Sequence, residues 1–370
     1  MIIQNVKLFL NGSFQAGGID FGERINDAGP HVRADDALDG EGAYLIPGLI
    51  DVHTHAAVDA DASDGNADGI FKMGRYYAKD GVTSWCPTTM TLKEPELTKA
   101  VKAIASYSRP ADGAKCAGIH LEGPFINREK MGAQNPANIA LPDVLFFRRL
   151  NDACGGIVKL ITMAPEAEGG IGFIREVSRD CTVSVGHTMA DYDTAMRAYE
   201  AGASHTTHLF NAMPPLLHRA PGVIGAALDA GAYVEMIVDG LHIDPAVMRL
   251  VHKLFGDRLI FISDSLRCAG MPDGEYELGG QPITMKNGRA TLSGTDTLAG
   301  SSIHLMEGIR RAVSYGIPLE ACVYAATEAP AKSIGIDDET GSLDAGKAAD
   351  LVLLDQDLNV KKVWIDGMEI

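Results

Sequence analysis

Short apolar runs alternate with amphipathic segments along most of the chain. Eight apolar runs follow one another, at 44–55, 81–89, 116–124, 155–166, 181–188, 203–213, 232–242 and 258–265. The segments between them, such as 69–81, 94–108, 191–203 and 244–257, repeat apolar residues at three and four positions and mostly end near Gly or Pro. Apolar runs that are each followed by a helical pattern are typical of parallel strands covered by helices. Eight such repeats predict an α/β fold, a (β/α)8 TIM-like barrel.

The two ends of the chain have a different pattern. Residues 1–44 are rich in Gly and Asp and contain short strand-like pieces, and residues 340–370 return to strands joined by turns. We therefore predict a small β-sandwich domain formed from 1–44 and 340–370, and a barrel domain over 45–339. An Asn-Gly pair between two alternating runs predicts a hairpin inserted after the eighth strand, at about 274–294.

Composition and charge narrow the range of partners. No apolar run approaches the roughly 20 residues that span a bilayer, and the N-terminus lacks the pattern of a signal peptide, so we expect a soluble, cytoplasmic protein without a membrane partner. The 6 Cys residues include no Cys-x-x-Cys pair, which argues against a disulfide framework and fits a reducing compartment. A net charge of −17 argues against nucleic acid as a partner, because that requires a positive field.

Polar residues recur at the ends of the predicted strands, where a barrel of this kind carries its active site. They are His53 and His55 on the first strand, Glu122 on the third, His187 on the fifth, His208 on the sixth, His242 on the seventh and Asp264 on the eighth. One such residue is usually a hydrogen-bonded strand-end group, but so many at one rim are hard to explain by coincidence. The pattern predicts a metal site.

The residue types indicate which chemistry this metal serves. Glu122, His187 and His208 are a common three-ligand set for catalytic Zn²⁺, with the fourth position open to water. Such an ion lowers the pKa of its bound water to about 7. Asp264 is then suited to take the water proton and return it to a leaving group. The set predicts metal-assisted hydrolysis, and no nucleophile elbow or dinucleotide fingerprint points elsewhere.

The loop after the sixth predicted strand carries a cationic pair, His218 and Arg219. An arginine side chain can bind phosphate through two parallel hydrogen bonds. A lone exposed arginine is more often simply solvated, so residue type alone leaves phosphate binding open.

With these residues in view, the sequence resembles the N-acetylglucosamine-6-phosphate deacetylases of the amidohydrolase superfamily over nearly its full length. The matching segments include PGLIDVHTH, GIHLEGPF, VSVGHT, THLFNAM, HRAPG, VDGLH and GSLDAGKAADLVLLD. The resemblance implies a homodimer that shares residues between its active sites, and hydrolysis of N-acetylglucosamine 6-phosphate to glucosamine 6-phosphate and acetate. It also implies that Glu122, His187 and His208 hold the metal, that Asp264 is the acid/base, and that Asn211, the backbone of Ala212, Arg219 and His242 contact sugar and phosphate.

Two positions depart from the family pattern. Where the family usually has a His that helps to polarise the substrate carbonyl, this chain has Gln134, which can donate a hydrogen bond to substrate but cannot carry a charge. Arg267 stands where small residues commonly follow the acid/base Asp, and we expect it to alter the pocket. Both departures leave open which N-acetylhexosamine is used.

The His53/His55 pair is not required for the chemistry, because some family members lack both residues and work with one metal. Side chains two apart on a strand share a face, so here the pair can form a second, weaker metal position beside Glu122. The alternative is that both histidines only hydrogen-bond around the site.

Two other functions compete with the sugar-phosphate deacetylase. One is another metal-dependent amidohydrolase acting on a non-phosphorylated amide, which would not need Arg219. The other is a non-catalytic protein on the same fold. A non-catalytic protein would be expected to lack metal ligands, whereas every ligand position is filled here.

Overall fold

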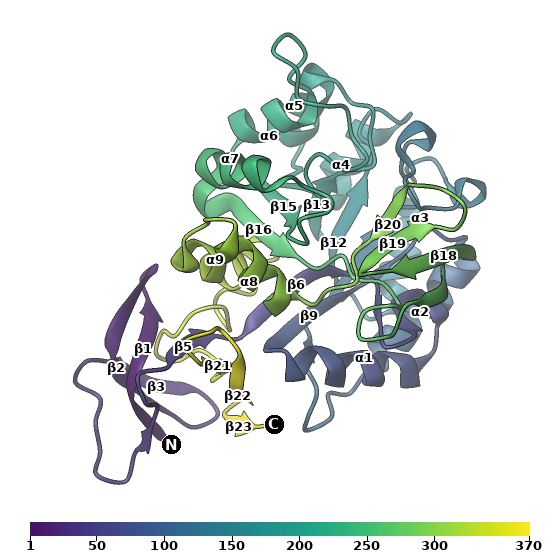
Figure 1. Cartoon of the computed structure of the whole chain (residues 1–370). Coiled ribbons are helices and arrows are strands. Elements are labelled where there is room, and N and C mark those ends of the chain that lie inside the picture. The colour runs from purple at the N-terminus through teal and green to yellow at the C-terminus, as the bar shows by residue number, and fades with distance from the viewer.

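Eight parallel strands curl into a barrel at the centre of the molecule (Figure 1). The structure is a computed structural model that describes all residues, 1–370. In order around the barrel the strands are β6 (Leu49–Thr54), β9 (Val82–Thr89), β11 (Ile119–Glu122), β12 (Val158–Met163), β13 (Thr182–Val185), β14 (His205–Thr206), β15 (Tyr233–Ile237) and β16 (Leu259–Ile262). The last strand meets the first where the backbone N–H of Asp264 donates to the carbonyl of His53 at 2.9 Å. The predicted barrel is confirmed.

A helix follows each barrel strand and covers its outer face (Figure 1). The helices are α1 (Ala67–Lys79), α2 (Glu94–Ala105), α3 (Val144–Ala153), α4 (Gly170–Val177), α5 (Tyr192–Glu200), α6 (Gly222–Ala230), α7 (Pro245–Phe255) and α8 (Leu305–Ser314), with α9 (Leu319–Ala325) and α10 (Glu328–Ser333) after them. In α1 the apolar stripe Ile70, Met73 and Tyr77 is buried, and Asn66 caps the first turn by accepting from the N–H of Asp68. Each helix is too short or too polar to cross a membrane.

Both ends of the chain form one further sheet beside the barrel, drawn in purple and yellow in Figure 1. Its strands are β1 (Ile2–Leu10), β2 (Ser13–Phe21), β3 (Ile25–Gly29), β4 (Leu38–Asp39), β5 (Tyr44–Pro47), β21 (Leu351–Leu354), β22 (Val360–Ile365) and β23 (Met368–Glu369). Strands from both termini enclose a separate small core that includes Ile3, Phe21, Leu351 and Trp364. This arrangement fits the predicted β-sandwich.

The first apolar run of the sequence is divided between the two sheets. Tyr44–Pro47 pairs with β1 and β21 in the terminal sheet, whereas Leu49–Thr54 pairs with β9 in the barrel. Between them, a β-carbon on Gly48 would lie 2.0 Å from Oγ1 of Thr83, so only glycine fits where the chain passes from one sheet to the other. The terminal sheet therefore extends to residue 47, beyond the predicted boundary at 44.

A four-stranded antiparallel sheet follows β16, and we call residues 274–300 the flap. It consists of β17 (Gly274–Leu278), β18 (Gln281–Lys286), β19 (Arg289–Leu292) and β20 (Leu298–Gly300), so it is longer than the hairpin expected at 274–294. Its buried face, with Leu278 and Ile283, packs on Met90 and Leu266. The short elements that remain are β7 (Ala56–Ala57), β8 (Ala60–Asp61), β10 (Lys115–Cys116), η1 (Ala62–Asp64), η2 (Arg128–Lys130), η3 (Pro136–Asn138) and η4 (Gly256–Arg258).

Candidate active site

A cavity of about 380 Å³ opens at the carboxyl ends of the barrel strands, beside the flap. That volume is in the range of small-molecule sites. The residues predicted for the site that line it are His55, Glu122, Gln134, His187, His208, Asn211, Ala212, His242 and Asp264. His53 lies beneath them, with none of its surface exposed. The structure therefore brings together side chains from distant parts of the sequence, as the strand-end pattern predicted.

Glu122, His187 and His208 form a close triangle of potential ligand atoms. Oε1 of Glu122 lies 3.1 Å from Nε2 of His187 and 3.0 Å from Nε2 of His208, and the two nitrogens are 3.1 Å apart. Ligand atoms around a tetrahedral ion with bonds of about 2.0–2.1 Å are about 3.3 Å apart. The spacing of the three atoms therefore fits a divalent metal.

In three histidines of the site, a hydrogen bond at the ring nitrogen Nδ1 fixes the orientation of the ring. Nδ1 donates to the carbonyl of Lys130 in His187 (2.8 Å), to the carbonyl of Thr88 in His55 (3.1 Å) and to the carboxylate of Glu235 in His53 (2.8 Å). In a neutral imidazole held by this bond, the lone pair of Nε2 points toward the cluster. Histidines held in this way can bind a metal.

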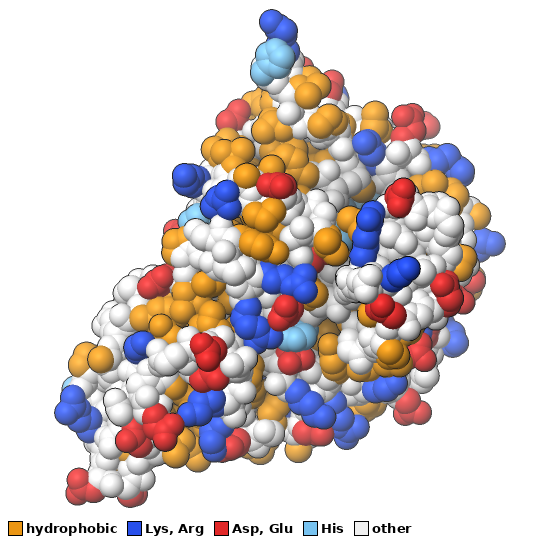
Figure 2. Space-filling view, in the orientation of Figure 1, with side chains coloured by type: hydrophobic (Ala, Val, Ile, Leu, Met, Phe, Trp, Pro, Cys, Tyr) orange, Lys and Arg blue, Asp and Glu red, His pale blue; other side chains and the backbone are white.

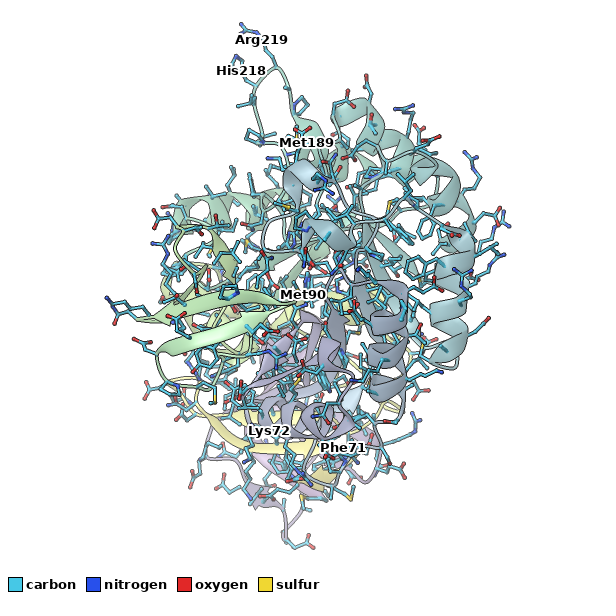
Figure 3. All side chains as sticks on the ribbon, turned by 90° about the vertical axis from the view of Figure 1, so that its right-hand side faces the viewer. Phe71, Lys72, Met90, Met189, His218 and Arg219 are labelled. Atoms are coloured by element: carbon cyan, nitrogen blue, oxygen red, sulfur yellow. The ribbon has the colours of Figure 1, made fainter.

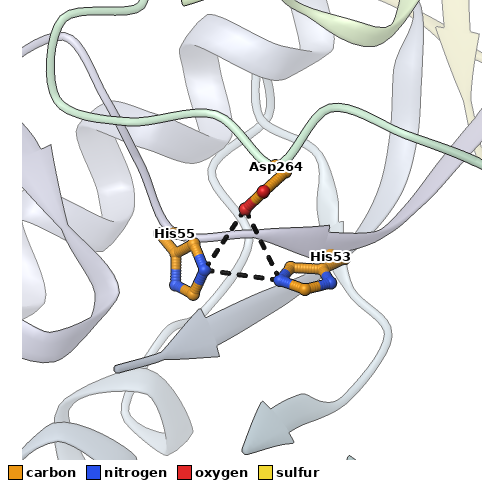
Figure 4. Close-up of side chains that lie close together, drawn as sticks. All are labelled: His53, His55 and Asp264. Carbon is orange, nitrogen blue, oxygen red and sulfur yellow. Dashed lines mark hydrogen bonds and ion pairs between the residues drawn. The ribbon is translucent and has the colours of Figure 1, made fainter. Parts of the chain in front are cut away.

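His53, His55 and Asp264 form a second group beside the first (Figure 4). The Nε2 atoms of the two histidines are 3.3 Å apart, and Oδ1 of Asp264 lies 3.3 Å from that of His55 and 3.6 Å from that of His53. Glu122 faces this group as well, because its Oε1 is 3.3 Å from Nε2 of His53 and its Oε2 is 3.3 Å from Nε2 of His55. One carboxylate thus stands between two possible metal positions.

The ionisable groups of the cluster strongly perturb one another. Burial alone would raise the pKa of Glu122, but the surrounding histidines, His187 first, hold it well below its usual value. Burial would lower the pKa of His55, yet the carboxylates of Asp264 and Glu122 raise it to about 10. The carboxylates therefore favour positive charge at this place, which is the charge that a metal brings.

Three of the candidate metal-binding and acid/base residues have left-handed backbone conformations. The φ angles are +48° at His187, +24° at His208 and +47° at Asp264. A non-glycine residue in this region costs about 1–3 kcal/mol and persists only where its surroundings impose it. In this structure the strained residues follow the ends of β13, β14 and β16 and carry the side chains that face the cluster.

Gln134 is buried at the cavity wall and is held at both ends of its amide. Its oxygen accepts from the N–H of Thr91 at 2.7 Å, and its nitrogen donates to Oε2 of Glu122. The amide thereby restrains the carboxylate that stands between the two metal positions. Contact of Gln134 with substrate stays a prediction.

His242 lines the cavity and is paired with a carboxylate. Its Nδ1 donates to Oδ2 of Asp239 at 2.8 Å, within the loop that follows β15. Burial would lower the pKa of His242, but Asp239 outweighs burial and raises it. A protonated His242 suits a negatively charged or oxygen-rich substrate in this acidic protein.

Arg219 and His218 do not line this cavity within one chain. Both are exposed at the tip of a loop between β14 and α6 that projects from the barrel (Figure 3). Backbone hydrogen bonds between Leu217 and Ala220 close the tip of this loop. Arg267 does not line the cavity either, because its guanidinium pairs with Asp64 and donates to the carbonyl of Glu277 on the flap. An effect of Arg267 on the pocket stays a prediction. Over the face shown in Figure 2, basic and acidic side chains are interspersed.

Three further polar residues, His120, His205 and Glu235, are buried inside the barrel. Both nitrogens of His120 are hydrogen-bonded to neutral groups, the carbonyl of Val52 (3.0 Å) and Oγ1 of Thr162 (2.8 Å), so it is a satisfied core histidine. Glu235, which sequence reasoning missed, lies on β15 between His53 and His205. The signal was a carboxylate in the middle of the apolar run 232–242, at a position that faces the interior.

Comparisons with known proteins show which family the chain resembles. The model of the Amidohydrolase family matches residues 44–370. The chain is 38% identical to the N-acetylglucosamine-6-phosphate deacetylase of Bacillus subtilis (strain 168) over 326 residues, which cover 86% of this chain and 82% of the relative. It is 34% identical to the N-acetylgalactosamine-6-phosphate deacetylase of Escherichia coli O157:H7 over 327 residues, 87% of this chain and 86% of the relative.

A solved structure is similar over the whole chain. It is a mutant of N-acetyl-D-glucosamine-6-phosphate deacetylase from Mycobacterium smegmatis, in complex with N-acetyl-D-glucosamine-6-phosphate. The TM-score is 0.93 at 33% identity, and the match covers 100% of this chain and 98% of the other.

Proposed function

The chain belongs to the amidohydrolase family, and on that premise we propose that it is a metal-dependent deacetylase of a 6-phospho-N-acetylhexosamine, with N-acetylglucosamine 6-phosphate as the substrate. The products are acetate and glucosamine 6-phosphate. The observation that carries the proposal is the triangle of Glu122, His187 and His208 at the floor of a cavity large enough for a sugar phosphate. Relatives of the same name and a similar structure that contains this sugar phosphate support the choice of substrate.

The reaction follows from the side chains around the cavity. A Zn²⁺ ion held by Glu122, His187 and His208 would supply a Lewis acid that lowers the pKa of water and polarises the amide carbonyl. Asp264, whose carboxylate lines the cavity, accepts the proton of the attacking water and passes it to the amine nitrogen as the C–N bond breaks. Gln134 holds Glu122 in place through the hydrogen bond from its side-chain nitrogen.

Substrate recognition combines residues of the cavity with a residue from outside it. Asn211, Ala212 and His242 line the cavity, and in this proposal Asn211, the backbone of Ala212 and His242 contact the sugar and its phosphate. Arg219 lies on the projecting loop next to Leu216 and Leu217, which are 40% and 53% exposed. Exposed apolar residues at a loop tip favour a protein partner. We infer a homodimer in which this loop reaches the partner's cavity and adds Arg219 to the phosphate site.

His53 and His55 supply a second, weaker metal position next to Asp264, with Glu122 shared between the two. Metal titration tests this assignment. The wild type should take up two equivalents and the His53→Gln, His55→Asn double mutant one. A wild type that stops at one equivalent in excess Zn²⁺ would contradict the second position without affecting the first.

The function is tested by acetate release from a panel of N-acetylated sugars. The panel pairs N-acetylglucosamine and N-acetylgalactosamine with their 6-phosphates, and the metal content of the same enzyme sample is measured by elemental analysis. We expect turnover of a 6-phosphate that chelation abolishes and added metal restores. Equal rates with and without the phosphate would favour an amidohydrolase for non-phosphorylated amides, and no acetate from any sugar would refute the proposal.

A further inference from the structure

Glu235 is a charged residue in the interior of the barrel that the proposed reaction does not use. It lies in the middle of β15, its surface is 0% exposed, and it does not line the active-site cavity. A carboxylate at such a position is destabilising unless charged or hydrogen-bonding partners compensate it. Its partners should therefore reveal what it is for.

The carboxylate contacts both groups of candidate metal ligands. Oε2 accepts from Nδ1 of His53 at 2.8 Å and from the backbone N–H of His208 at 3.1 Å. Oε1 lies 3.2 Å from Nε2 of His205 on the neighbouring strand. Glu235 thus connects β6, which carries His53, to the strained residue His208 that follows β14.

The partner of His53 differs in kind from the partners of His55 and His187. Nδ1 of His55 and Nδ1 of His187 each donate to a backbone carbonyl, whereas Nδ1 of His53 donates to a carboxylate. A carboxylate holds the Nδ1–H form more firmly than a carbonyl and makes Nε2 a better donor to a metal. In that form the lone pair of Nε2 points toward Glu122 and Asp264, which lie 3.3 and 3.6 Å away.

We propose that Glu235 is a positioning residue that holds His53 in its metal-binding tautomer and, through the His208 amide, ties the two metal positions together. This inference rests on the proposed function, because it assigns a role within the second metal position. Glu235 itself touches neither substrate nor metal.

The test compares the binding of Zn²⁺ and the state of His53 in two variants. Glu235→Leu removes the acceptor, and Glu235→Gln keeps an amide oxygen that can still accept from Nδ1. We expect Glu235→Leu to weaken the second equivalent of Zn²⁺ by about 10- to 100-fold and Glu235→Gln to restore part of the loss. His205→Gln, which leaves the Glu235–His53 contact intact, is the matched control and should bind both equivalents as the wild type does.

Two further readouts separate positioning from a general structural role. In metal-free protein, at a pH high enough for His53 to be a neutral imidazole, ¹⁵N spectra of labelled histidine should show His53 protonated at Nδ1 in the wild type and at Nε2 in Glu235→Leu. In a His53→Gln background, Glu235→Gln should cause no additional loss of Zn²⁺ binding, because the residue through which Glu235 acts is gone. This cycle decides the matter even if the Leu variant does not fold.

The inference is overturned if His53 keeps its tautomer in a folded Glu235→Leu variant, or if Glu235→Gln weakens Zn²⁺ binding equally with and without His53. These outcomes differ from a failure of the proposed function. If the wild type released no acetate or bound a single Zn²⁺, the proposed function or the second metal position would fail. The tautomer of His53 in metal-free protein would still test the role of Glu235, because that measurement needs neither substrate nor metal.

Discussion

Replacing Asp264 with Asn removes the proton acceptor of the cavity while keeping the shape of the side chain. Asp264 has a φ of +47°, a conformation that Asn tolerates better than most residues, so we expect the variant to fold. The backbone N–H of residue 264, which closes the barrel by donating to the carbonyl of His53, is unaffected by the change. The variant therefore isolates the carboxylate.

The magnitude of the effect follows from the role assigned to that carboxylate. General acid–base catalysis contributes typically about 10²- to 10⁴-fold, which corresponds to about 2.7–5.4 kcal/mol of activation free energy. Glu122, His187 and His208 contact one another without Asp264, so the tighter metal should remain bound. We expect kcat to fall by this factor with little change in KM.

The assay is the initial rate of acetate release at saturating substrate, with the metal content of each sample determined in parallel. Asp257→Asn is the matched control, because it makes the same change at an exposed aspartate. Asp257 lies just before the start of β16, whereas Asp264 follows the end of that strand. A turnover for Asp264→Asn within about threefold of the wild type, with metal bound, would refute the assignment of Asp264 as the acid/base.

Three further variants test the metal, the phosphate contact and the charge on the cavity wall. Glu122→Gln should lose metal on elemental analysis along with activity, since it removes the charged oxygen ligand, and a fully loaded and active variant would place the site elsewhere. Arg219→Ala should raise KM for a 6-phosphorylated substrate and spare an unphosphorylated one, whereas equal losses would make this residue structural. Asp239 raises the pKa of His242, and an anionic substrate binds best while this imidazole is protonated, so KM should rise as pH increases through that pKa. Asp239→Asn removes the carboxylate that raises this pKa, so the rise in KM should occur at lower pH when KM is measured between about pH 6 and pH 9. An unshifted profile would contradict the charged role of His242.

The periodicity of the sequence was sufficient to predict the barrel, because each strand and each helix must bury an apolar face of its own. Once eight strands are known to be parallel, their carboxyl ends share one rim, and polar residues at those ends must meet there. For this reason Glu122, His187, His208 and Asp264 could be selected before any distance was known. The division of the run 44–55 between two sheets could not be predicted in this way, since both halves are equally apolar. The break depends on the close approach of Thr83 to Gly48, which only the tertiary structure shows.

The sequence by itself therefore determined the class of fold, the rim on which the candidate site lies and a set of residue types that suits a divalent metal. Only the tertiary structure decided the partners of those residues. It showed that Gln134 binds Glu122, that Glu235 supports His53, and that Arg219 projects away from its own cavity. The physical reason is the distance along the sequence over which each feature is set. Burial patterns depend on neighbours within one strand or helix, whereas a hydrogen bond between side chains of distant segments requires two atoms to be positioned within a few tenths of an ångström.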